Sequence, residues 1–89
     1  MKWKKNVTVI REQGNIILCL GKKQCSVLET DIYLVKAIKT GVHDEEKLKE
    51  LIMEHDSSNE TVAGLTLAKF ILDYQIYLEK DNDYYEITM

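Results

Sequence analysis

Residues 57–78 read SSNETVAGLTLAKFILDYQIYL, and their apolar side chains fall on two sides of one predicted helix. At about 100° per residue, one side carries Ala63, Leu67, Phe70, Ile71, Tyr74 and Leu78. The roughly opposite side carries Val62, Leu65, Ala68, Leu72 and Ile76. Burial of one side is enough to hold such a helix. The other side therefore either packs against the rest of the monomer or lines a surface that is open to a partner.

Two shorter helices are predicted before this one. The first starts at a capping Thr30 and ends before Gly41, and His43 or Asp44 caps the second. The spacing of residues 57–60 is that of a capping box, which predicts the start of the third helix. The inward positions of the first two helices are Ile32, Leu34, Val35, Ala37 and Ile38, then Leu48, Leu51, Ile52 and His55.

Three strands are predicted before the helices. Residues 6–12 are rich in β-branched side chains, residues 16–20 form a short apolar run, and residues 24–28 follow a second turn. Connections this short favour an antiparallel meander. Residues 84–88 suggest a further short strand. The expected fold is α+β and winged-helix-like, a single domain spanning residues 1–89, with a three-stranded meander, three helices and a possible short C-terminal strand.

The composition is that of an ordinary globular chain, with 45% apolar and 30% charged residues. The longest apolar run, Ile16 to Leu20, is far too short to span a membrane. No charged-then-apolar leader with a cleavage site opens the chain, so we expect a cytoplasmic location without membrane association.

Charge is unevenly distributed along the chain. Residues 1–28 carry six cationic side chains and one acid, whereas residues 29–89 carry six lysines and fourteen acids. A basic sheet beside an acidic helical body favours the attraction of an acidic peptide to one end. The alternative is that each half is simply a solvated surface.

No arrangement of residues predicts catalysis, a metal site or a cofactor. Cys19 and Cys25 flank a predicted hairpin turn, and we expect reduced thiols that fill a half-buried sheet. A zinc site that adds His43 and His55 lacks the close paired spacing that structural zinc prefers. Paired carboxylates, a phosphate loop and a Ser/His/Asp arrangement are also not evident, so we expect a protein that is not an enzyme.

The order of apolar positions resembles that of a PqqD-like domain, the recognition element for precursor peptides that are made on ribosomes and then modified. The resemblance covers Val7 to about Leu78 and is carried by Leu28-Glu29-Thr30, Ile32, Val35, Ile38, Gly41, Leu48, Leu51, Ile52, His55-Asp56, Val62, Leu67, Phe70-Ile71 and Tyr74. Three positions depart from the family pattern. Glu29 stands where the family has asparagine, a glycine near residues 75–77 is missing, and so is a proline before the third strand.

The resemblance implies that the domain performs no chemistry itself. Such domains bind the leader segment of a precursor peptide as an added strand, with the third helix as the other wall, and a separate modifying enzyme acts on the peptide. The implied strand edge comprises Lys23, Gln24, Cys25, Ser26 and Val27. The implied helical wall comprises Leu65, Ala68, Lys69, Leu72 and Ile76.

General physical principles also favour peptide binding at such a strand edge. An open strand edge has unpaired N–H and C=O groups, which an extended peptide satisfies by β-augmentation. Apolar residues of the helix then accept alternate side chains of the peptide. Lys69, with Lys22 and Lys23 on the sheet, is placed to attract acidic leader residues.

Two other functions remain open at this stage. In a winged-helix DNA-binding regulator the third helix would contact duplex DNA, although it offers only Lys69 as a cation and the chain has one arginine, Arg11. In a homo-oligomerisation module such as a homodimer, the second apolar side of the third helix would pack on another copy. Trp3 is either an exposed aromatic anchor or a lid over the sheet edge.

Overall fold

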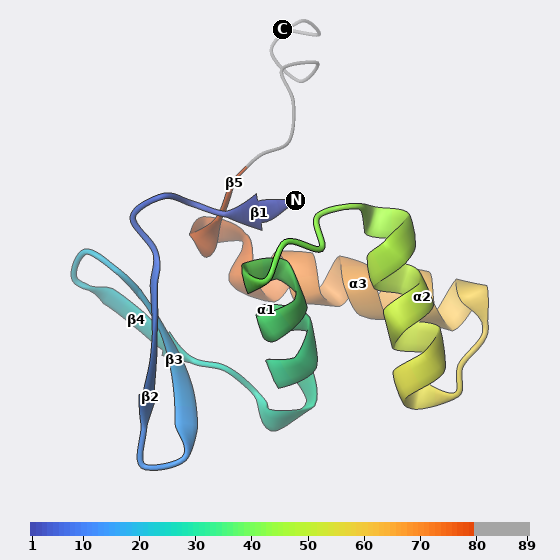
Figure 1. Ribbon diagram of the computed structural model, residues 1–89, viewed down its shortest axis with the longest axis horizontal. Helices are drawn as coiled ribbons and strands as arrows, with labels where there is room; N and C mark the ends of the chain where they lie inside the picture. The colour runs from blue at the N-terminus through green and yellow to red at the C-terminus, as the bar shows by residue number, and fades with distance from the viewer. Residues whose placement is uncertain (80–89) are drawn as a thin grey trace, which may run out of the picture.

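A three-stranded antiparallel meander precedes three helices, so the predicted α+β fold is confirmed (Figure 1). The computed structural model describes residues 1–79. The elements are β1 (Lys2–Trp3), β2 (Thr8–Glu12), β3 (Asn15–Leu20), β4 (Lys23–Ser26), α1 (Ile32–Lys39), α2 (Glu45–Asp56), α3 (Glu60–Tyr74) and β5 (Leu78–Glu79). Short 3₁₀ turns span Glu29–Asp31 and Gln75–Tyr77.

A short C-terminal strand is present, but it lies earlier in the chain than expected. β5 pairs with β1 in a separate two-stranded ribbon, with Trp3 opposite Leu78. Leu78 is therefore a buried strand residue and does not extend the third helix. The strand predicted at residues 84–88 lies outside the described residues.

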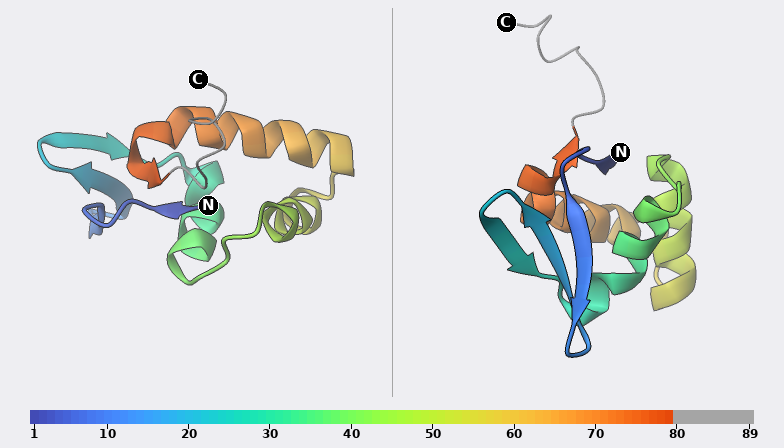
Figure 2. Two further views of the ribbon diagram at one scale, coloured as in Figure 1. Left: turned by 90° about the horizontal axis from the view of Figure 1, so that it is seen from above. Right: turned by 60° about the vertical axis from the view of Figure 1, so that its left-hand side comes forward.

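The meander has the order β2-β3-β4, and its alternating side chains divide it into two faces. Ile16 and Leu18 of β3 are buried, and Leu18 lies opposite Cys25 of β4. The other face carries Ile10 and Ile17 as neighbours, and Ile10 is exposed. One face of the meander thus packs on the core (Figure 2).

A side-chain oxygen caps the start of each of α2 and α3. Asp44 caps α2, because its Oδ1 accepts the N–H of Glu46 at 3.0 Å. The predicted capping box at residues 57–60 is wrong: Asn59 caps α3 by accepting the N–H of Val62 at 2.9 Å. Ser57 instead ends α2 in the left-handed region, with a φ of 54°.

The predicted cap of α1 is also wrong. Thr30 lies within the 3₁₀ turn, and the residue that precedes α1 is Asp31, whose side chain caps nothing. Asp31 is instead bonded to the far end of α3, because Tyr74 Oη donates a hydrogen bond to its Oδ2 at 2.8 Å. Gly41 follows α1 with a φ of 112°, as predicted for a helix C-terminal glycine.

Trp3 covers part of the core. Its Nε1 donates to the carbonyl oxygen of Val35 at 3.4 Å, and its ring meets Phe70 edge-on with centroids 6.2 Å apart. The side chain is half-buried, so Trp3 acts as a lid. Across residues 1–79, no helix has both the length and the apolar character needed to cross a bilayer.

Candidate functional site

β4 is an edge strand, and its register shows which of its backbone groups face outward. The N–H of Val27 bonds the carbonyl of Ile16 at 2.8 Å, so the backbone of Val27 faces β3. Because backbone direction alternates along a strand, the predicted edge 23–27 offers outward groups only at Gln24 and Ser26. Within the described part of the chain, no backbone group bonds the N–H or C=O of these two residues.

The next outward donor along the edge is already occupied. Leu28 N–H donates to Tyr74 Oη at 3.2 Å, and the same hydroxyl donates to Asp31. Burial raises the pKa of Tyr74 to about 12, and the bond to Asp31 acts in the same direction. The Tyr74 hydroxyl thus fixes the C-terminal part of α3 beside the end of β4 (Figure 2).

The second apolar side of α3 is not covered by the described residues. Leu65 and Leu72 are 68% and 66% exposed, and Ile76, in the following 3₁₀ turn, is 43% exposed. Leu65 lies four residues before Lys69 and Leu72 three after it, so all three share one side of the helix. The sequence left open whether this side is buried, and residues 1–79 leave it accessible.

A hollow of about 260 Å³ connects the end of β4 with this side of α3. Leu28, which is 54% exposed, and Lys69 both line it. Its floor includes the ring of Tyr33, which stacks on His55 with centroids 3.7 Å apart. The remaining lining residues are Thr30, Asp31, Asp56, Thr66 and Phe70.

Electrostatically, the hollow is less basic than the sequence suggested. Lys69 Nζ lies 2.6 Å from Asp73 Oδ2, and this pair raises the pKa of Lys69. Two carboxylates, those of Asp31 and Asp56, also line the hollow. Burial raises the pKa of Tyr33 to about 12, and these two acids add to the effect. Lys69 therefore contributes less to the attraction of acidic ligands than its charge alone predicts.

Some residues of the predicted site do not belong to one surface. Ala68 lines a different hollow of about 280 Å³ between α3 and α2, together with Glu45 and Lys49. Val27 is only 7% exposed and packs in the core. Cys25 is half-buried on the same face as Val27, where its nearness helps to raise the pKa of Tyr77 beyond the effect of burial. Gln24 and Ser26 lie on the outward edge of β4, and Lys69, Leu72 and Ile76 are exposed on α3 and the turn that follows it. The hydrogen bond between Leu28 and Tyr74 joins the end of this edge to the end of α3.

Several residues of the site were missed as binding residues. Leu28 follows directly on the predicted edge run, so its position in the sequence was a usable signal. Tyr33 and His55 lie on separate helices, and Tyr74 is 46 residues from its partner Leu28. No local pattern reveals pairings of this length.

Within residues 1–79, no three His, Cys, Asp or Glu side chains lie close enough together to hold a metal ion. Cys19 and Cys25 are free, half-buried thiols, as expected, and they point to opposite faces of the sheet. Comparisons of the chain with protein-family models, curated proteins and solved structures found no match.

Proposed function

We propose that this domain binds the leader segment of a ribosomally made precursor peptide along β4 and presents it to a separate modifying enzyme. The observation that carries the proposal is the unpaired edge at Gln24 and Ser26 beside the exposed apolar side of α3. The resemblance to PqqD-like domains, drawn from the sequence, supports the same function.

The geometry suits an extended chain. A peptide that runs along β4 satisfies the outward N–H and C=O groups of Gln24 and Ser26. Its alternate side chains then point toward α3, where Leu72 and Ile76 are accessible. Main-chain hydrogen bonds give affinity in such a complex, and the apolar contacts give sequence preference.

The hollow beside Leu28 adds a place for one further side chain. Its lining combines the exposed Leu28 with the stacked rings of Tyr33 and His55 and with two carboxylates. An apolar or basic residue of the leader fits this chemistry better than an acidic one. The hollow therefore extends the proposed groove beyond the end of β4.

Peptides selected on the full chain from a displayed random library provide the test. Nuclear magnetic resonance should show the amide signals of Gln24 and Ser26 shifting on titration of a selected synthetic peptide. The Leu72→Asp variant should bind that peptide with an affinity at least about thirtyfold lower, because an important interface residue contributes about 2 kcal/mol. Ala68→Asp places the same charge on the α2 side of the helix and should leave affinity nearly unchanged.

Circular dichroism establishes that both variants fold. The proposal is contradicted if a selected peptide does not shift the amide signals of Gln24 and Ser26, or if it binds the Leu72→Asp variant with unchanged affinity. Failure to select any peptide also contradicts it. Sedimentation of the free chain tests the rival occupant, because a dimer that Leu72→Asp dissociates assigns the apolar side of α3 to a second copy.

A further inference from the structure

The opposite edge of the meander borders a second groove, between β2 and α1. Two adjoining hollows of about 480 and 160 Å³ form it, and both are lined by Val9 and Lys39. The larger extends past Trp3 to His43, and the smaller extends to Arg11 and Lys36. This groove shares no lining residue with the hollow beside β4.

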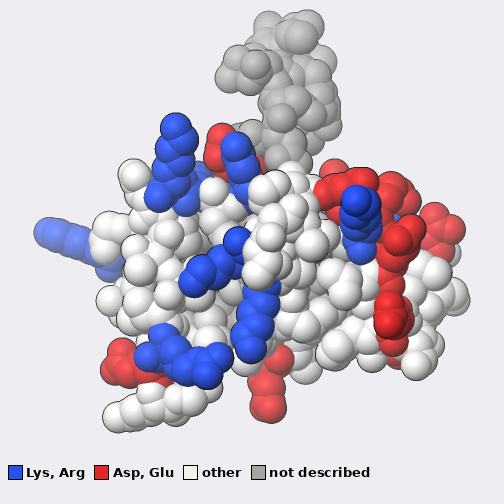
Figure 3. Space-filling model, viewed as in Figure 1, with Lys and Arg blue, Asp and Glu red and all other residues white. Residues whose placement is uncertain are grey.

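The charge in this groove has one sign. Its cationic lining residues are Lys2, Arg11, Lys36 and Lys39, and none of the described residues that line it is a carboxylate. Among the described residues, Arg11, Lys36 and Lys39 have no ion-pair partner, and Lys2 lies 3.9 Å from Glu79. Cationic side chains gather over the sheet and α1, whereas acids gather over α2 (Figure 3).

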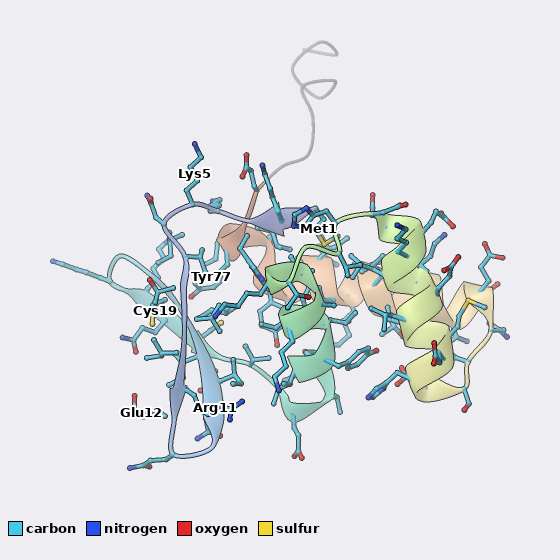
Figure 4. The ribbon with its side chains drawn as sticks, in the orientation of Figure 1. Met1, Lys5, Arg11, Glu12, Cys19 and Tyr77 are labelled. Carbon is cyan, nitrogen blue, oxygen red and sulfur yellow. The ribbon has the colours of Figure 1, made fainter. Side chains whose placement is uncertain are left out.

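The backbone of β2 also has outward groups on this side. β3 directs residues 16, 18 and 20 toward β4, so it directs residues 15, 17 and 19 toward β2. Their partners are Glu12, Ile10 and Thr8, which leaves Val9 and Arg11 with outward backbone groups. No backbone bond to these groups occurs within residues 1–79. The Arg11 side chain points toward α1 and that of Glu12 points away from it (Figure 4).

We propose that an acidic, extended peptide segment binds along β2 in this groove, with its carboxylates facing Arg11, Lys36 and Lys39. A strand edge presents donors and acceptors in turn, which matches a peptide backbone. A phosphate backbone has acceptors only, so it leaves the outward carbonyls of Val9 and Arg11 without a donor. The charge of −3 for the whole chain also opposes general binding of polyanions.

This groove is a second binding surface, distinct from the one assigned to the leader peptide. The two lie on opposite edges of one sheet, so both ligands fit at the same time. The inference therefore does not depend on the proposed function at β4.

The test uses the full chain and two synthetic probes, an extended peptide that alternates glutamate with valine and its glutamine counterpart. The glutamate peptide should bind, shift the amide signals of Val9 and Arg11, and weaken as salt rises. The Lys36→Glu/Lys39→Glu variant should lose about tenfold in affinity, because surface ion pairs are worth up to about 1 kcal/mol each. Lys5→Glu/Lys47→Glu makes the same charge change at exposed residues that do not line the groove, and should have a far smaller effect.

Three results overturn the proposal. One is equal binding of the glutamine peptide, or no binding of either. Another is that the glutamate peptide shifts the amide signals of Gln24 and Ser26 in place of those of Val9 and Arg11. The third is tighter binding of random duplex DNA than of the glutamate peptide at equal salt, which assigns the groove to nucleic acid.

Discussion

The two edges of the meander have the same backbone chemistry but different surroundings. β4 runs beside an apolar helix side, and the chain's own Tyr74 occupies the donor at its end. β2 runs beside a groove lined by unpaired cations from β2 and α1. One sheet therefore presents an apolar margin, the β4 edge with the exposed side of α3, and a cationic margin, the β2 edge with α1.

Under the two proposals, the neighbouring helix, more than the strand, determines which ligand each edge accepts. Leu72 of α3 exposes apolar surface beside β4, so affinity there depends on desolvation and should vary little with salt. Lys36 and Lys39 of α1 line the groove beside β2. The affinity of this groove for an acidic peptide should therefore fall as salt screens these charges. Cations on an edge also discourage pairing between two copies of β2.

The largest expected effect comes from Phe70, because it supports both margins. It is 2% exposed and packs against Tyr74, with centroids 4.9 Å apart, and against Trp3. Phe70→Ala should lower the free energy of unfolding by about 3–5 kcal/mol, since it removes a buried aromatic ring. Urea unfolding followed by circular dichroism measures this.

Leu72→Ala on the exposed side of the same helix is the control. It should change the unfolding free energy by no more than about 0.5 kcal/mol. An equal loss in the two variants would mean that Leu72 is buried in solution, and the apolar margin would not be accessible.

Tyr74→Phe should give an intermediate effect and sharpen the contrast between the edges. Loss of the hydroxyl removes its bonds to Leu28 and Asp31, so we expect about 1–2 kcal/mol of destabilisation. The freed N–H of Leu28 then becomes a third outward group, so a β4 peptide should bind more tightly and a β2 peptide should not. Calorimetric titration of both peptides measures the difference, and a change at both edges would contradict it.

The same tyrosine gives the protein a dependence on alkaline pH. The pKa of Tyr74 is about 12 in the fold, compared with an ordinary value of 10.0. Between these values the unfolded chain releases a proton that the folded chain retains, so stability is complete below pH 10 and falls as pH rises toward 12. Tyr33 contributes in the same way, so Tyr74→Phe should reduce this fall without abolishing it. Urea unfolding at a series of alkaline pH values measures the slope.

Periodicity predicted the elements well because each pattern is local. The alternation in residues 6–12 and the two short turns were enough for the meander, and the apolar spacing after residue 60 was enough for α3. The second apolar side of that helix was also visible in the sequence. Whether that side is exposed could not be predicted, because its exposure depends on where β4 and α2 pack.

Pairings between distant residues could not be predicted. β1 and β5 are two residues long each and lie at opposite ends of the described chain, so no pattern marks them. The cationic groove likewise needs Arg11 from a strand and Lys36 from a helix to meet across a groove. Only the fold brings such residues together.

The smallest expected effect concerns the start of α3, where the sequence favoured the wrong cap. The side chain of Asn59 satisfies the N–H of Val62, so Asn59→Ala should lower the unfolding free energy by about 1 kcal/mol. Ser57 makes no such bond, so Ser57→Ala should cost much less. Neither change touches α1, so Lys36 and Lys39 should bind the acidic peptide with unchanged affinity. Urea unfolding of the two variants distinguishes the two caps. A larger decrease in the free energy of unfolding for Ser57→Ala would support the predicted capping box and contradict a cap by Asn59.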